Sequence, residues 1–331
     1  MRWLIVLPFE RPEHMGMDWK AELLAMGHEV RTFPYRRDNP LYKNRGTKEA
    51  YEIWILRRLE AVCRQWHPGI VLVIKGGPIT PGVIRRIKAR ADTVFVNLFP
   101  DNPLWMIPFD RIEAYDVFFT KDRYAKAALE HVGLRNLCYL PLYCVPELHH
   151  PVTLTGEETR RLASRVSLVG SCYPYRERLL SELAQYPIRL WGSGWDRAES
   201  PAVRAMVAGG VVWGRTKLAI YSGSVVSLNH HHPTNDIAGV NTRAFELAAS
   251  GVCQVVDEKE ALPALFVPGD EVVTYRDLDG LRRQLDYCLA HPDEARAIGQ
   301  NAKRRALKEH TLRCRIEEML AVIEERCGRS L

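Results

Sequence analysis

The residues best suited to binding chemistry lie in the stretch 239–251 of the 331-residue chain. Asn241 and Thr242 are residue types that cap a helix start, because their side-chain oxygens accept hydrogen bonds from its free amides. A helix start carries a partial positive charge and can hold a phosphate. Arg243 adds a forked donor for phosphate oxygens. Gly239 would let the backbone approach such an anion closely.

Glu246 lies one helical turn further along, about 5 Å at 1.5 Å per residue. That is roughly the separation of a diphosphate from the ribose attached to it, and a carboxylate is well suited to binding a ribose diol. The alternative is structural, with Glu246 complementing the helix dipole and Asn241 serving only as a cap. The stretch therefore predicts either a nucleotide site or an ordinary capped helix.

Three runs in this region resemble the CgeB-like glycosyltransferases, a branch of the GT-B class related to the group-one transferases: residues 227–229, 239–246 and 249–251. The similarity continues through 262–271 to the last helix. It implies that Glu246 holds the ribose of the donor, while the preceding loop and helix start hold its diphosphate. Related retaining enzymes carry a further Glu at the position of Ala238. Asp236 is nearby but out of register, so the stereochemical course stays open.

Two loops of the second half offer further contacts for a nucleotide. The strand 165–169 leads into Gly170, Ser171 and Arg176, where a glycine turn could cradle a phosphate and the arginine could clamp it. The CgeB-like family has a similar Gly-then-Arg element. The strand 188–191 leads to Trp195, which could stack on a base or be a surface residue of a turn.

Lys217 is a second candidate for a phosphate contact, although a lone lysine is usually solvated. His230 and His231 leave a strand just before the donor motif and could contact the diphosphate or the sugar. Three adjacent histidines cannot all face one metal, so no metal site is expected. No cofactor is expected beside the donor substrate.

Strands and helices alternate through the first half, which favours a parallel sheet with helices on both faces. Ligands of such sheets bind beyond the carboxyl ends of the strands. Lys75, Gly76 and Gly77 follow the apolar strand 70–74 and are candidates to line a cleft. The alternative is an ordinary glycine turn with a solvated lysine.

Asp101 and His14 are the candidate catalytic bases. Asp101 follows the strand 93–98, and the CgeB-like family has a similar Asp-x-Pro element there, although Asp before Asn-Pro is also common turn chemistry. An inverting reaction would need a side-chain base, and either residue could serve. In a retaining reaction the leaving phosphate can itself take the proton of the acceptor.

The fold class expected is α/β of the GT-B type, with two Rossmann-like domains facing a cleft. A proline-rich segment, 141–151, divides residues 1–148, the acceptor side, from residues 152–310, the donor side. Its paired His149 and His150 suggest a linker. Residues 311–331 are expected to form a helix that crosses back to the first domain.

Bulk composition fits a folded protein, with 47% apolar and 26% charged residues. No apolar run is long enough to span a bilayer, and residues 1–7 are expected to form the first strand rather than a secretion signal. Eight cysteines without a C-x-x-C pair suggest reduced thiols in a cytoplasm. The basic clusters 85–90 and 303–305 indicate solvated helix faces rather than a nucleic-acid surface. A net charge of +6 fits an anionic ligand or peripheral contact with an acidic membrane without requiring either.

The predicted function is metal-independent transfer of a sugar from a nucleotide-diphosphate sugar to an unidentified acceptor. Two alternatives remain. One is a nucleotide-sugar epimerase or hydrolase on the same fold. The other is a non-catalytic nucleotide-binding or coat-associated protein, which Ala238 keeps open.

Overall fold

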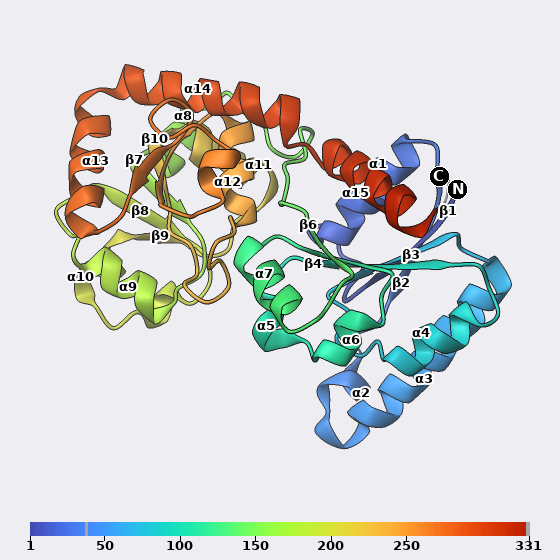
Figure 1. Cartoon of the computed structure of the whole chain (residues 1–331). Helices are drawn as coiled ribbons and strands as arrows, with labels where there is room; N and C mark the ends of the chain where they lie inside the picture. Colours follow the sequence, from blue (N-terminus) through green and yellow to red (C-terminus); the bar gives the residue numbers. More distant parts are fainter. Residues whose placement is uncertain (37–38, 329–331) are drawn as a thin grey trace. The chain divides into compact units, whose positions relative to one another are not determined.

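The computed structural model describes residues 1–36 and 39–328 and divides into two compact units (Figure 1). Unit 1 contains the residues up to Pro141, the short segment Thr234–Gly239, and the helix that begins at Leu312. Unit 2 contains Leu142–Pro233 and Val240–Thr311.

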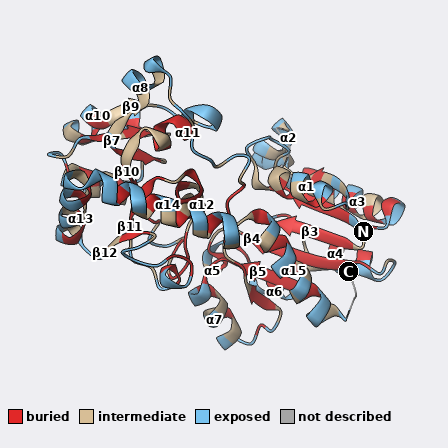
Figure 2. Ribbon diagram, turned by 90° about the horizontal axis from the view of Figure 1, so that it is seen from above, coloured by how far each residue is buried: buried red, intermediate tan, exposed pale blue. Residues whose placement is uncertain are grey.

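Unit 1 is built on a six-stranded parallel sheet in the order β2-β1-β3-β4-β5-β6. Its strands are β1 (Arg2–Leu7), β2 (Glu29–Pro34), β3 (Ile70–Ile74), β4 (Val94–Phe99), β5 (Val117–Thr120) and β6 (Leu137–Tyr139). Its helices are α1 (Met15–Ala25), α2 (Pro40–Lys43), α3 (Arg45–Trp66), α4 (Pro81–Lys88), α5 (Pro103–Met106), α6 (Phe109–Glu113), α7 (Arg123–His131) and α15 (Leu312–Cys327). Every residue of β3 is buried, as its continuous apolar run predicts (Figure 2).

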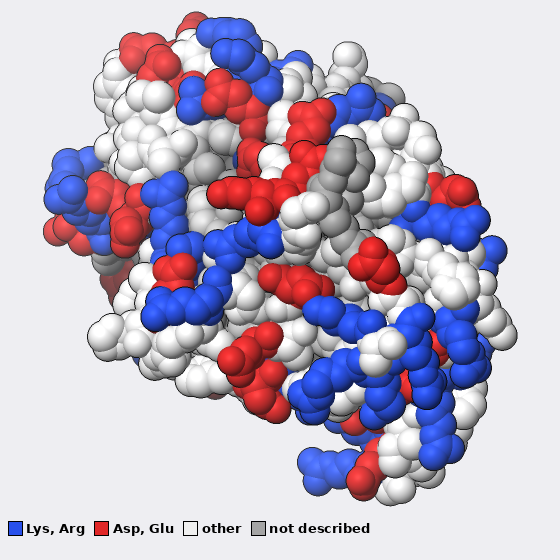
Figure 3. All heavy atoms as spheres, turned by 45° about the vertical axis from the view of Figure 1, so that its right-hand side comes forward, with Lys and Arg blue, Asp and Glu red and all other residues white. Residues whose placement is uncertain are grey.

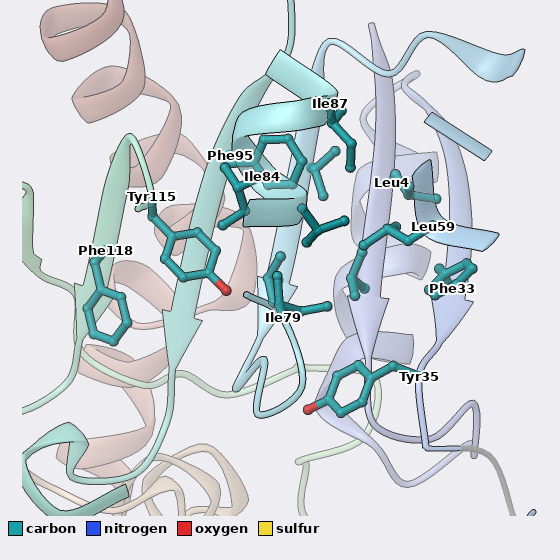
Figure 4. Close-up of a cluster of buried hydrophobic side chains, with 14 of the residues drawn as sticks. Leu4, Phe33, Tyr35, Leu59, Ile79, Ile84, Ile87, Phe95, Tyr115 and Phe118 are labelled. Carbon is teal, nitrogen blue, oxygen red and sulfur yellow. The ribbon is translucent and has the colours of Figure 1, made fainter. Parts of the chain in front are cut away.

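Helices α3 and α4 cover one face of this sheet with apolar side chains. Leu59 from α3 and Ile84 and Ile87 from α4 belong to the same buried cluster as Leu4 and Phe95 from the strands (Figure 4). Burying each such side chain is worth about 1.5–3 kcal/mol. This packing fixes the sheet, and with it the loops at the carboxyl ends of the strands.

The helical period of the sequence predicts a buried stripe of Tyr51, Ile55, Leu59, Val62 and Trp66 along α3, and the structure differs from it at one position. Cys63 is fully buried, whereas Val62, which the periodicity placed on the stripe, is only half-buried. Cys63 lies four residues after Leu59 and so continues the same line along the helix. The buried residue at this point of the helix is thus Cys63, whereas the sequence pattern predicts Val62.

Unit 2 repeats the architecture with a six-stranded parallel sheet in the order β12-β11-β10-β7-β8-β9. Its strands are β7 (Ser164–Val169), β8 (Ile188–Trp191), β9 (Val207–Gly209), β10 (Ser224–Asn229), β11 (Cys253–Asp257) and β12 (Val273–Tyr275). Its helices are α8 (Gly156–Leu162), α9 (Pro174–Ser181), α10 (Pro201–Met206), α11 (Gly214–Ser222), α12 (Thr242–Ser250), α13 (Leu278–Ala290) and α14 (Pro292–Glu309), with short 3₁₀ turns at Trp195–Arg197 and Leu262–Ala264.

The last helix, α15, packs within unit 1. Arg313 Nε donates to Glu22 Oε1 on α1 at 2.6 Å. At the other end of α15, Arg326 donates to the carbonyls of Arg135 and Leu137 beside β6. In the part of the chain that is described, no helix combines the length and apolarity needed to cross a membrane.

Candidate functional site

The start of α12 is held in place by a network of neutral amides. Asn241 caps the helix, its Oδ1 accepting from the amide of Ala244 at 3.1 Å. Its Nδ2 donates to Oδ1 of Asn229, the last residue of β10, at 2.9 Å. Gln254 of β11 donates to the carbonyl of Ala244 at 3.0 Å and accepts from Asn229. The capping role predicted for Asn241 is thus present, and the helix start is fixed to two adjacent strands.

Arg243 extends from this fixed helix start towards the turn after β7. Its Nη1 donates to Asn229 Oδ1 at 3.3 Å. A Cβ added to Gly170 would lie 2.5 Å from Arg243 Nη2 and 3.4 Å from Arg176 Nη1. The two guanidinium groups therefore share the space beside Gly170, and only glycine leaves room for both.

Arg176 is 4% exposed and is held by backbone oxygens. Its Nη1 donates to Ser171 O at 2.5 Å and its Nη2 to His230 O at 2.9 Å. Burial, and next the neighbouring charge of Arg243, lower the pKa of Arg176 to about 10. It remains cationic at neutral pH.

This arginine pair has no acidic partner. Among the described residues no carboxylate forms an ion pair with either guanidinium, and Arg176 Nε is buried without a hydrogen bond. Two like charges held together without a directly paired carboxylate favour binding of an anion. Forked donors match the oxygens of a phosphate or diphosphate.

Glu246, one turn along α12, forms an ion pair with Lys217 of α11 and lies near His149, whose pKa is lowered by burial. Lys217 Nζ lies 2.5 Å from Oε2, and His149 Nε2 lies 3.7 Å from Oε1. Burial by itself would raise the pKa of Glu246, but Lys217 and, less strongly, His149 hold it below its usual range. The side chain of Glu246 is 16% exposed, and its ionised carboxylate keeps lone pairs for a further donor.

Two expectations change at this cluster. Lys217 was predicted to contact phosphate, but its ammonium pairs with Glu246. His149 was interpreted as part of a linker, but its Nδ1 accepts from the amide of Val145 at 2.9 Å, which directs Nε2 towards Glu246. No local pattern indicates a contact across 97 residues.

An aromatic cluster lies beside the arginine pair and has no counterpart in the sequence prediction. Tyr173 and Tyr175 stack with ring centroids 5.6 Å apart, and Arg176 Cζ lies within 5.5 Å of both ring centroids. His230 Nδ1 and the Tyr275 hydroxyl are 2.8 Å apart. Burial lowers the pKa of His230 to about 4, so its ring is neutral at neutral pH. Tyr173 is 41% exposed and could pack against a sugar or a base.

His231 and Trp195, both predicted to contact the donor, are enclosed. His231 is 1% exposed, and its amide and Nδ1 both lie 2.8 Å from Asp257 Oδ1. Trp195 is 1% exposed, so its interpretation as a surface residue is wrong. Its Nε1 donates to Gly170 O at 2.7 Å, which supports the glycine turn instead of offering a ring face to a base. The other predicted residues of this region, Ser171 and Thr242, are half-buried, at the turn after β7 and at the first position of α12.

In unit 1 the structure brings three predicted residues together at the carboxyl ends of β1, β3 and β4. Lys75 Nζ lies 2.5 Å from Asp101 Oδ2. Burial, with a contribution from Lys75, lowers the pKa of His14. His14 Nδ1 accepts from the amide of Gly16 at 3.1 Å, so the neutral ring carries its proton on Nε2. His14 is therefore arranged as a hydrogen-bond donor, and Asp101 is the better placed of the two predicted bases.

The turn after β3 has an unusual backbone. Lys75 has a φ of 63°, in the left-handed region, and Gly76 follows with 83°. Such strain is typical of functional sites. Gly76 is buried and its amide donates to the Tyr35 hydroxyl at 3.2 Å, whereas Gly77 is exposed. Of the three residues predicted to line a cleft, Lys75 and Gly77 reach the surface.

The segment Thr234–Gly239 is anchored within unit 1 by buried charges. Lys121 Nζ forms a short ion pair with Asp236, and both side chains are at most 3% exposed. Asp122 Oδ2 accepts from the amides of Ala238 and Gly239 at 3.1 and 2.9 Å. A Cβ on Gly239 would lie 2.6 Å from Lys121 O.

These contacts revise one expectation, that for Gly239, and show that Asp236 has a structural partner. The close approach that Gly239 permits is to the backbone after β5, rather than to an anion, and its amide is already paired. Asp236 is buried against Lys121, so it does not replace the glutamate that retaining relatives carry at the position of Ala238.

Residues 176–321 match the sequence profile of a family described as glycosyl transferase-like. The matched segment includes Arg176, Lys217, Arg243 and Glu246. The match is to this broad family and does not single out the CgeB-like branch. A comparison with curated proteins found no match.

Solved structures share the fold over the whole chain. They include a sucrose-phosphate synthase from Thermosynechococcus elongatus, with a TM-score of 0.73 and 14% identity over 100% of both chains. The glycosyltransferase AviGT4 of avilamycin A biosynthesis gives a TM-score of 0.64 and 18% identity over 99% of this chain and 98% of its own. Anabaena HepE in complex with UDP-glucose gives 0.66 and 11% over 98% and 99%. The prediction of two Rossmann-like domains of the GT-B type is thereby confirmed.

Proposed function

We propose that this protein is a glycosyltransferase that moves a sugar from a nucleotide-diphosphate sugar to an acceptor. The observation that carries the proposal is the pair of the buried Arg176 and the half-buried Arg243 beside Gly170, which forms no ion pair with a described carboxylate and lies one helical turn from the ionised Glu246. The match of residues 176–321 to a glycosyl transferase-like family supports the same reaction class. HepE, which has this fold, is described in complex with UDP-glucose.

In this proposal each group of unit 2 has a separate task. Arg176 and Arg243 stabilise the negative charge that develops on the diphosphate as the glycosidic bond breaks, which is the largest electrostatic demand of the reaction. Because these cations sit where the charge appears, we expect transfer to proceed without a divalent metal. Glu246 accepts hydrogen bonds from the ribose hydroxyls, and Lys217 and His149 keep it ionised and in position.

The acceptor side is proposed for unit 1. If the reaction inverts the anomeric centre, Asp101 is the proposed base, with Lys75 orienting its carboxylate. If it retains the configuration, a leaving phosphate oxygen takes the acceptor proton, and no protein carboxylate is needed at the position of Ala238. We further propose the CgeB-like branch, on the runs around Asn229 and Glu246.

A thermal-shift panel tests the proposal. A ligand that binds only the folded protein raises the unfolding temperature, so we expect one family of nucleoside diphosphates and their sugars to raise it, with and without EDTA. No shift from any nucleotide would refute the assignment of the site.

A second candidate function is nucleotide binding without transfer. Ala238 and the buried Asp236 favour it, because neither offers a carboxylate to the donor. Tight binding with no turnover across acceptors would select it. Consumption of the donor without any acceptor would instead select an epimerase or hydrolase.

A further inference from the structure

Helix α3 carries two large apolar side chains on its outer face. Ile53 is 50% exposed and Trp54 is 44% exposed, while the opposite face of the helix packs into the core of unit 1. Arg58 lies over the Trp54 ring, with its Cζ 5.0 Å from the ring centroid. The outer face thus combines an aromatic ring, an aliphatic side chain and a cation.

Cations continue from this point along α3 and onto α4. The exposed residues Ile53, Trp54, Arg57, Arg58, Arg64, Arg85, Arg86, Lys88 and Arg90 are called the α3–α4 basic face. Figure 3 shows Lys and Arg side chains gathered at its lower right, over the part of unit 1 where Figure 1 places these two helices.

The face is continuous for two reasons. Positions 54, 57, 58, 61 and 64 on α3 each have a neighbour in this set three or four residues away, and so line one side of the helix. Arg86 of α4 donates through Nε to Glu60 Oε1 of α3 at 2.8 Å, which joins the two helices side by side.

Most of the charge on this face is uncompensated. Arg86 pairs with Glu60 and Lys88 with Asp116. Arg57, Arg58, Arg64, Arg85 and Arg90 form no ion pair with any described carboxylate. At the start of α3 the nearby Glu52 is 3.9 Å from Lys48, so it adds little net negative charge.

We propose that the α3–α4 basic face binds the surface of an anionic lipid bilayer, with Trp54 and Ile53 entering the headgroup region. Membrane-surface segments combine basic residues, which are attracted to anionic lipids, with apolar side chains that enter the boundary between headgroups and acyl chains. Tryptophan prefers that depth because its ring is apolar and its N–H polar. An RNA partner would use the cations but would leave Ile53 without a role.

Vesicle flotation of the full chain tests the proposal. We expect binding to vesicles of phosphatidylcholine with phosphatidylglycerol, none to phosphatidylcholine alone, and strong weakening by salt. Each cation at an anionic surface contributes about fivefold to partitioning, so Arg57→Ala with Arg58→Ala should weaken it about thirtyfold. Trp54→Ser should also weaken binding to the anionic vesicles, because it removes the ring that enters the headgroup region.

The matched control is Arg160→Ala with Arg161→Ala, an exposed arginine pair on α8 of unit 2. It should bind vesicles as the parent protein does, and all variants should keep the parent unfolding temperature. Equal binding to both vesicle types would overturn the proposal. So would an unchanged Arg57/Arg58 variant, or binding to RNA with no binding to vesicles.

Discussion

A single added methyl group tests the arginine pair without removing any functional group. In Gly170→Ala the new Cβ would fall 2.5 Å from Nη2 and 3.2 Å from Cζ of Arg243. The backbone at Gly170 has an ordinary φ, so alanine fits the turn, and the displaced atoms are the end of a flexible side chain. We therefore expect the protein to fold normally while the Arg243 guanidinium is displaced from its position beside Gly170.

The expected loss follows from the hydrogen bonds at stake. A hydrogen bond to a charged group is worth about 1.5–3 kcal/mol, so losing one of the forked contacts to a diphosphate should raise its Kd about 10- to 150-fold. Calorimetric titration with the nucleoside diphosphate that binds the parent protein best measures this. Gly156→Ala, at an exposed position of α8 where a Cβ meets only the end of the Arg160 side chain at 3.8 Å, is the matched control.

The outcome that refutes the reasoning is equally plain. If folded Gly170→Ala binds the nucleotide as tightly as the parent, Arg243 and Arg176 do not hold the diphosphate. Loss of binding together with a lowered unfolding temperature would indicate damage to the turn, and Arg243→Ala, which removes the guanidinium without crowding, would then decide the matter.

Three further predictions concern Glu246, His230 and Lys121. Glu246→Ala should raise the Kd of nucleoside diphosphates at least about tenfold, from lost charged hydrogen bonds, but leave that of pyrophosphate unchanged; equal losses for both ligands in calorimetry would disprove the ribose role. The pKa of His230 is about 4 in the folded protein and 6.5 in the unfolded chain, so the unfolded chain binds the extra proton between these values; stability present above pH 6.5 is lost as the pH falls towards 4. His230→Asn should flatten this slope in urea unfolding, whereas the exposed His131→Asn should keep it. Lys121→Met should destabilise unit 1 by about 3–5 kcal/mol, because it removes the cation that pairs with the buried Asp236 charge. Adding Asp236→Leu should recover most of the lost stability. A double variant as unstable as the single one would contradict this explanation.

Local rules account for what the sequence predicted well. The cap at Asn241 and the buried run of β3 each depend on residues within a few positions of one another. Hydrogen bonds of a cap and the burial of an apolar run are decided over that range. These elements, and the parallel sheets they imply, could therefore be read from the sequence.

Tertiary pairing accounts for what it missed. Glu246 meets Lys217 and His149 because α11, α12 and the segment after β6 come together only in the folded unit. Trp195 follows a Gly-Ser-Gly turn of the kind found on protein surfaces, yet its indole is buried in the core and donates a hydrogen bond to Gly170 O. Asp236 is a residue type that could serve in a binding site, but its side chain is buried in an ion pair with Lys121. Only this burial shows that its role is structural.

The amide network around Arg243 has a consequence for how the protein would respond to acid. Asn229, Asn241 and Gln254 carry no ionisable group, so the hydrogen bonds among them that position Arg243 persist at any pH at which the protein stays folded. Protonation can reach the pocket through Glu246, through His149 or His230 beside it, or through the phosphate of a ligand. A titration of affinity against pH would therefore report on these groups and not on the amide network.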